Sequence, residues 1–130
     1  MNDQPVTRAT VATGGCQCGA IRYALYAHPK DPHLCHCRMC QKAVGGPFAA
    51  LGPVQRTMFA WTRGAPTTFA SSTVAERSFC NRCGTPLAFA YVDSDWIDVT
   101  LGSLGAIAER LRAKRSNRGG KESQAQDLPF

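Results

Sequence analysis

Short runs of alternating apolar and polar side chains occupy most of the chain. In AIRYALY (20–26), Ile21, Tyr23 and Leu25 occupy every second position, the pattern of a strand with one buried face. Gly14 and Gly15 before this run, and the Pro and Asp residues after it, indicate turns. Further strands, many rich in aromatic residues, are predicted at 47–51, 58–61, 67–71, 76–79, 86–92 and 96–101. The pattern is typical of a mainly β fold of short strands with little helix.

Two segments have helical rather than strand character. RMCQKAVG (38–45) predicts one short helix that is ended by Gly45 and Gly46. Leu104, Ile107 and Leu111 keep helical spacing, so a last amphipathic helix is expected over 104–115. The residues after it are polar and include glycine, which predicts a mobile tail.

Length and composition indicate one folded domain. The chain has 130 residues, of which 44% are hydrophobic and 18% charged, as in ordinary globular proteins. No apolar stretch approaches the length of a membrane span, and MNDQPVTRAT lacks the basic start and apolar core of a secretory signal. We therefore expect a cytoplasmic protein with no membrane partner. In that compartment cysteines stay reduced and usually indicate metal binding or catalysis.

Positive charge is concentrated near the C-terminus. Residues 1–109 carry nine basic and seven acidic side chains, a net charge of +2, whereas residues 110–130 carry six and two, a net charge of +4. We predict one folded domain over 1–109 and a basic, flexible tail over 110–130. A solvated tail is a commoner reason for such charge than nucleic-acid binding, which we consider unlikely.

The chemistry of the chain is carried by its cysteines. They form three groups, which are Cys16 with Cys18, then Cys35, Cys37 and Cys40, and finally Cys80 with Cys83. Residues two apart in a strand face the same side, so the first pair can bind one metal ion. FCNRCGTP has the form of a zinc knuckle, in which the glycine lets backbone amides face the sulfurs. The first and last pairs together make a closed four-cysteine site that joins distant parts of the chain.

The middle group supplies three thiolates and no evident fourth ligand. Three protein ligands with one open position are the arrangement of catalytic zinc sites. Because four and three ligands use every cysteine, we expect two zinc ions per chain, one structural and one catalytic at Cys35, Cys37 and Cys40.

Other uses of these cysteines remain possible. A single zinc ribbon of Cys37 and Cys40 with Cys80 and Cys83 would leave three cysteines idle and needs a long spacing between its pairs. A redox C-x-x-C needs a strand-to-helix setting in a βαβ fold. If the segment is a strand, His36 faces away from the neighbouring cysteines, in a supporting or solvent-facing position.

These motifs resemble those of a known family. GGCQCGAIRYAL, CHCRMCQKAVGGPF, FAWTRG, RSFCNRCGTPLAF and VTLGSL occur in the order found in the glutathione-dependent formaldehyde-activating enzymes, a family that also includes centromere protein V. The resemblance implies a β-tent fold of antiparallel sheets that carry zinc. It also implies structural zinc ligands at Cys16, Cys18, Cys80 and Cys83, and catalytic zinc ligands at Cys35, Cys37 and Cys40.

The sequence departs from the family pattern at two places. Val44 stands where Ser or Thr is common, and the segment after LGSL lacks the His and Trp that relatives carry there.

The family reaction joins glutathione and formaldehyde to S-hydroxymethylglutathione, which is carbon–sulfur lyase chemistry. We therefore expect a zinc-dependent enzyme that acts on adducts of a small thiol such as glutathione with formaldehyde or a related aldehyde. The carboxylates of glutathione need nearby cations, and the candidates are Arg38, Lys42, Arg56 and Arg63. The alternative is a non-enzymatic zinc module that binds a protein or nucleic acid. The sequence does not specify an oligomeric state.

Overall fold

The computed structural model describes residues 8–105, which form nine short strands, one α-helix and two 3-10 turns. The helix expected over 38–45 is confirmed, and it ends at Gly45 in the left-handed conformation, with φ of 73°. The bounds are β1 (Ala12–Gly15), β2 (Arg22–Leu25), β3 (His33–Cys35), α1 (Arg38–Val44), β4 (Ala49–Gln55), η1 (Arg56–Met58), β5 (Phe59–Arg63), β6 (Thr67–Ala70), β7 (Ala75–Phe79), β8 (Pro86–Tyr91), β9 (Trp96–Thr100) and η2 (Leu101–Ser103).

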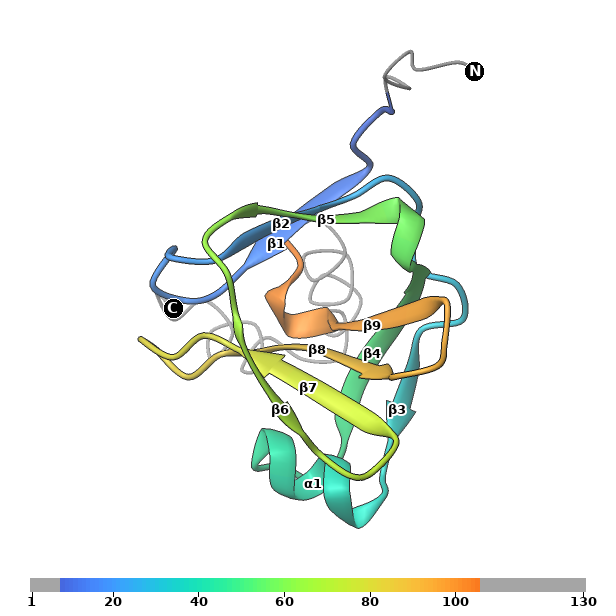
Figure 1. The fold of residues 1–130 in the computed structure, drawn as a ribbon, viewed down its shortest axis with the longest axis vertical. Helices are drawn as coiled ribbons and strands as arrows, with labels where there is room; N and C mark the ends of the chain where they lie inside the picture. Colours follow the sequence, from blue (N-terminus) through green and yellow to red (C-terminus); the bar gives the residue numbers. More distant parts are fainter. Residues whose placement is uncertain (1–7, 106–130) are drawn as a thin grey trace, which may run out of the picture.

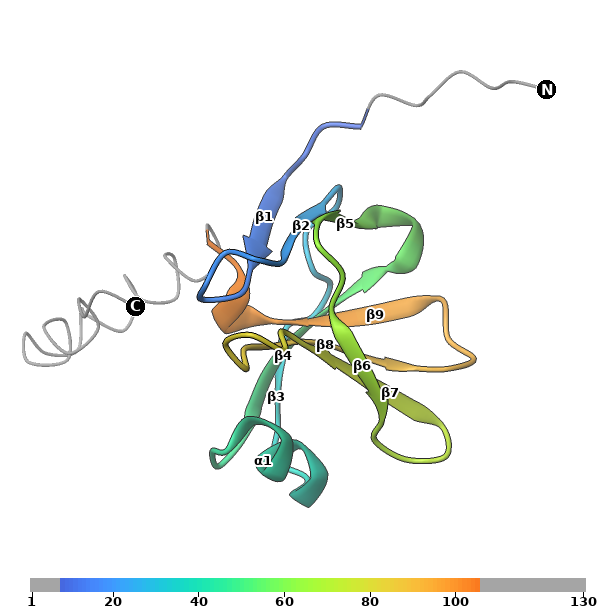
Figure 2. The same ribbon diagram turned by 60° about the vertical axis from the view of Figure 1, so that its left-hand side comes forward.

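The strands form two antiparallel sheets. The smaller sheet has the order β1-β2-β5, and the larger has the order β3-β4-β9-β8-β7-β6 (Figure 1). In Figure 2 the small sheet lies at one end of the molecule and α1 at the other, beside β3. The expectation of a mainly antiparallel β fold with little helix is confirmed.

Both sheets contribute side chains to one main core. In β9 exposure alternates, so that Ile97 and Val99 are buried while their neighbours are half-exposed. Tyr23 and Leu25 of β2 reach the same cluster from the smaller sheet. Each such side chain stabilises the fold by about 1.5–3 kcal/mol relative to leaving it in water. Trp61 packs against this cluster and meets the Tyr23 ring edge-on, with 5.8 Å between ring centroids.

The glycines expected to form a turn before the first strand lie in β1 instead. Gly14 pairs with Tyr23 across the small sheet. A side chain on Gly14 would collide with the carbonyl oxygen of Ser103 and the ring of Tyr23. Glycine is therefore present because two segments approach the strand closely, and not because the chain turns there.

Two other segments differ from the sequence expectation. β3 directly follows the turn residues Asp31 and Pro32 and was not among the predicted strands, and it pairs with β4 from His33↔Leu51 to Cys35↔Ala49. Leu104 is extended and bridges Gly14, so the helix expected over 104–115 does not begin there. The rest of that helix and the predicted tail lie outside the described residues.

Within residues 8–105, no helix has the length and apolar character needed to cross a membrane.

Candidate metal centres

Four cysteines from two hairpin turns meet in one cluster. Cys16 and Cys18 lie between β1 and β2, while Cys80 and Cys83 lie between β7 and β8. Their Sγ atoms all lie within 4.8 Å of one another. Cys16 and Cys18 converge because the chain turns between them, and not because they share the face of a strand as we expected. The cluster joins the small sheet to the large one.

Backbone N–H groups face the sulfurs of this four-cysteine cluster. The N–H of Ile21 donates to Cys16 Sγ at 3.2 Å, and the N–H of Arg82 donates to Cys80 Sγ at 3.4 Å. Gly84 adopts φ of 84°, which confirms the glycine-dependent turn expected for the knuckle. Hydrogen bonds from Thr85 lower the pKa of the Cys83 thiol to about 5. These contacts favour thiolates, the form in which cysteine binds a metal.

Cys35, Cys37 and Cys40 form a second cluster, and their Sγ atoms also lie within 4.8 Å of one another. Cys35 ends β3, Cys37 is the N-cap of α1, and Cys40 lies in the first turn of the helix. This strand-to-helix junction replaces the strand on which we had placed His36. That histidine packs against the ring of Phe48, with 5.5 Å between ring centroids.

The three thiols of this cluster have different surroundings. The N–H of Cys40 donates to Cys37 Sγ at 3.4 Å, and this hydrogen bond lowers the pKa of the exposed Cys37 thiol. Burial raises the pKa of the Cys40 thiol to about 11. Cys37 is therefore the accessible sulfur of the cluster, and Cys40 is the sulfur that anchors it to the core.

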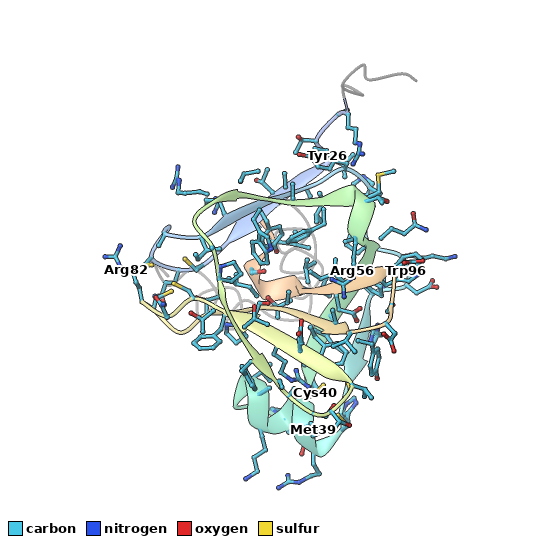
Figure 3. The ribbon with its side chains drawn as sticks, viewed as in Figure 1. Tyr26, Met39, Cys40, Arg56, Arg82 and Trp96 are labelled. Atoms are coloured by element: carbon cyan, nitrogen blue, oxygen red, sulfur yellow. The ribbon has the colours of Figure 1, made fainter. Side chains whose placement is uncertain are left out.

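The two clusters are separate, which matches the division of the cysteines into four and three. Figure 3 shows Cys40 on α1 at the lower end of the molecule and Arg82, between Cys80 and Cys83, at its left edge. The single ribbon that would combine Cys37 and Cys40 with Cys80 and Cys83 is not formed. Both clusters are able to hold a metal ion.

Arg77 of β7 contacts the three-cysteine cluster, and the sequence analysis did not identify it. One terminal guanidinium N–H donates to Cys40 Sγ at 3.4 Å, and Nε–H donates to Ser71 Oγ at 2.8 Å. The side chain is only 8% exposed. The alternation along β7 contained a signal, because Ala75 and Arg77 are buried while Glu76 between them is exposed.

Two cavities lie beside this arginine. The first has a volume of about 350 Å³ and is mostly apolar, with walls that include Val44, Leu51, Phe79 and Phe89. The second has a volume of about 410 Å³ and lies along α1. It is lined by Arg38, Met39, Lys42, Ala43, Phe69, Ser71 and Arg77.

The structure places the four predicted substrate-binding cations in different regions. Arg38 and Lys42 lie on α1 and line the second cavity. The Arg56 guanidinium instead donates to the carbonyl oxygens of Ser94 and Tyr91, and Figure 3 shows it beside Trp96, away from Cys40. Arg63 donates to the carbonyl oxygen of Gly19, between β1 and β2. The structure does not bring the last two arginines to the three-cysteine cluster.

The model of one protein family matches most of the chain. The family is described as the glutathione-dependent formaldehyde-activating enzyme, and the match covers residues 11–117. The chain belongs to this family. The match begins just before β1 and continues into the segment that we separated as a tail.

Two individual proteins that resemble the chain were also found. The chain is 39% identical over 82 residues to a protein of Schizosaccharomyces pombe named as an uncharacterized lyase. That alignment covers 62% of the chain and 58% of the relative, so the chain spans less than two thirds of the yeast protein. The crystal structure of a Rhodobacter sphaeroides protein shares the fold, with a TM-score of 0.62 and 23% identity over 72% of this chain and 88% of that one.

Proposed function

We propose that the protein is a zinc-dependent carbon–sulfur lyase that handles adducts of a small thiol with a small aldehyde. Glutathione with formaldehyde or a related aldehyde is the substrate class. The observation that carries the proposal is the cluster of Cys35, Cys37 and Cys40, which offers three sulfur ligands and contacts Arg77, a residue that lines two cavities. The family match and the lyase name of the yeast relative support the same class of chemistry.

The residues present fit zinc at both clusters. Thiolate sulfur is a preferred ligand of this ion, and backbone N–H groups already face Cys16 and Cys80. We assign a structural zinc to the four-cysteine cluster, whose four thiolates would supply all of its ligands. We assign a catalytic zinc to Cys35, Cys37 and Cys40, which leave one ligand position free. A zinc ion held by these three sulfurs would lower the pKa of an incoming thiol, so that the thiol binds as thiolate.

The reaction forms one covalent bond, which joins the two substrates. The sulfur of glutathione bonds to the carbonyl carbon of the aldehyde, and the thiol proton ends on the carbonyl oxygen. With formaldehyde the product is S-hydroxymethylglutathione, and the reverse reaction breaks the same carbon–sulfur bond. Arg38 and Lys42 would hold a carboxylate of the substrate, and their position favours them over Arg56 and Arg63.

We also propose a cytoplasmic location and keep the division into a domain over 1–109 and a basic tail over 110–130. All seven cysteines lie among the described residues and none forms a disulfide, which is the state that a reducing compartment maintains.

The decisive experiment is the rate of adduct formation above the spontaneous reaction of glutathione with formaldehyde. The wild type should exceed that background, and Cys37→Ser should return to it. Glutathione should also strengthen the sulfur-to-metal charge-transfer absorption of cobalt-substituted wild-type protein. If the wild type adds nothing to the background and its cobalt spectrum ignores glutathione, the proposed activity is wrong for this thiol.

A further inference from the structure

Arg77 is the only charged side chain that is buried among residues 8–105. No carboxylate in that part of the chain lies within ion-pair distance of it. A buried charge without a partner is costly, so a guanidinium in this position requires an anion nearby. The sulfurs of the three-cysteine cluster would supply part of that charge when a metal holds them as thiolates, and Cys40 Sγ accepts a hydrogen bond from Arg77.

The surroundings of Arg77 leave part of its guanidinium available. Its hydrogen bonds to Ser71 and Cys40 use two N–H groups, and the ring of Phe89 covers one face, with Cζ 4.7 Å from the ring centroid. The other N–H groups have no acceptor among the described residues. These three contacts fix the orientation of the guanidinium, so its free donors are already in place for a ligand.

The cavity along α1 has the charge of an anion site. Arg38, Lys42 and Arg77 all line it, and no acidic side chain does. Arg77 is the buried member of the three, whereas Arg38 and Lys42 are exposed at the rim. A carboxylate is planar and accepts paired hydrogen bonds from a guanidinium, which makes it the anion that best matches this group.

We infer that Arg77 forms a carboxylate-binding site in the cavity along α1, for the acid group of a small thiol whose sulfur binds at the three-cysteine cluster. The inference rests on the proposed function, because it takes the thiol site as given and names the chemical class of its ligand. The guanidinium donates to Cys40 Sγ directly. A carboxylate held by the same guanidinium therefore lies close to the cluster, within reach of a sulfur only a few bonds away in the same molecule.

Two thiols of equal length test this site. Mercaptoacetate and mercaptoethanol are titrated into cobalt-substituted protein, and the charge-transfer absorption reports their binding. Mercaptoacetate should bind about tenfold more tightly, because it adds a charge-assisted hydrogen bond to the same sulfur contact. The preference should shrink as salt is added, since Arg38 and Lys42 act through solvent.

Variants test whether Arg77 causes the preference for mercaptoacetate. Arg77→Gln should remove it, and Arg77→Lys should keep only part, because lysine lacks the planar fork. Lys30→Gln is the matched control, since it removes an exposed cation that does not line the cavity. The NMR signal of the Arg77 Nε–H group in the wild type tests the site without any variant. Its chemical shift should change more with mercaptoacetate than with mercaptoethanol.

The outcomes separate this inference from the proposed function. Equal affinity for the two thiols, with equal shifts of the Arg77 resonance, overturns the carboxylate site and leaves the thiol site standing. If neither thiol changes the cobalt spectrum, the thiol site is wrong, and acetate alone then decides the anion site. A saturable shift of the Arg77 resonance with acetate upholds the anion site, whereas no shift overturns it.

Discussion

The Sγ atoms of Cys18 and Cys80 lie 3.8 Å apart, although 62 residues separate them in the chain. Each belongs to a hairpin turn of a different sheet, so a metal bound between them joins the two sheets. The cluster of Cys35, Cys37 and Cys40 joins only β3 to the helix that follows it. The two clusters should therefore contribute very differently to stability.

We predict that Cys80→Ser prevents stable folding and that Cys37→Ser does not. A structural zinc contributes on the order of 10 kcal/mol of apparent binding free energy to the folded state. Cys37 is exposed, so its loss should remove only the second metal and the activity. Thermal unfolding of the two variants, with the wild type alongside, checks this. Equal losses of stability would mean that both clusters are structural.

Protein purified without added metal should contain close to two zinc ions per chain. The reason is that two groups of sulfur ligands are assembled and no cysteine remains outside them. Elemental analysis against protein concentration gives the ratio. A reproducible value of one, together with free alkylation of Cys16 and Cys18 in the folded protein, would contradict two zinc sites.

Selective removal of metal from the three-cysteine cluster should make Cys37 the first thiol to react with iodoacetamide. Only the thiolate reacts, and the pKa of Cys37 is lowered by the N–H of Cys40. Its labelling should therefore persist as the pH falls below the usual range of a thiol. The pKa of Cys40 is raised to about 11, so that thiol stays protonated and protected at neutral pH.

Mass spectrometry of the labelled peptides gives the order of reaction at each pH. The Arg77→Gln variant is a useful comparison, since it removes the side chain that contacts Cys40 Sγ. Labelling of Cys40 before Cys37 in the wild type would mean that the helix does not protect its sulfur.

Gly14→Ala should lower the free energy of unfolding by about 1–3 kcal/mol, the usual cost of forcing an extra methyl group into packed structure. The new methyl group would collide with Ser103 and Tyr23. Gly102→Ala is the matched control, because nothing lies within 4 Å of the position that its methyl group would take. Its effect should stay within about 0.5 kcal/mol. Urea unfolding of both variants measures the difference, and equal losses would argue against the close contact.

The sequence predicted those elements whose signal is local. β9 alternates cleanly between buried and half-exposed residues, and α1 ends at two glycines, so both were recognised. β3 carries no such signal, because Leu34 at its centre is 52% exposed and the strand exists through its pairing with β4. Gly14 was wrongly predicted to lie in a turn. Position 14 requires glycine because Ser103, which is far away in sequence, lies too close for a side chain.

The grouping of the cysteines was predictable because pair spacing and the need to use every sulfur leave few combinations. The role of Arg77 was not, although its strand was assigned correctly. The alternation along β7 places Arg77 on the buried face of the strand, but it does not indicate that Cys40 lies opposite. That contact depends on how α1 is placed relative to β7, which no local pattern in either segment encodes.

The bridge between Gly14 and Leu104 joins residues that the ribosome adds at very different times. β1 and β2 are made before Leu104 and before the second half of the four-cysteine cluster. Until then Cys16 and Cys18 lack the sulfurs that complete their metal site, and the small sheet lacks its closing strand segment. The metal ion of the four-cysteine cluster can therefore bind only when synthesis has passed the β7–β8 turn, whereas the cluster of Cys35, Cys37 and Cys40 is complete well before that point.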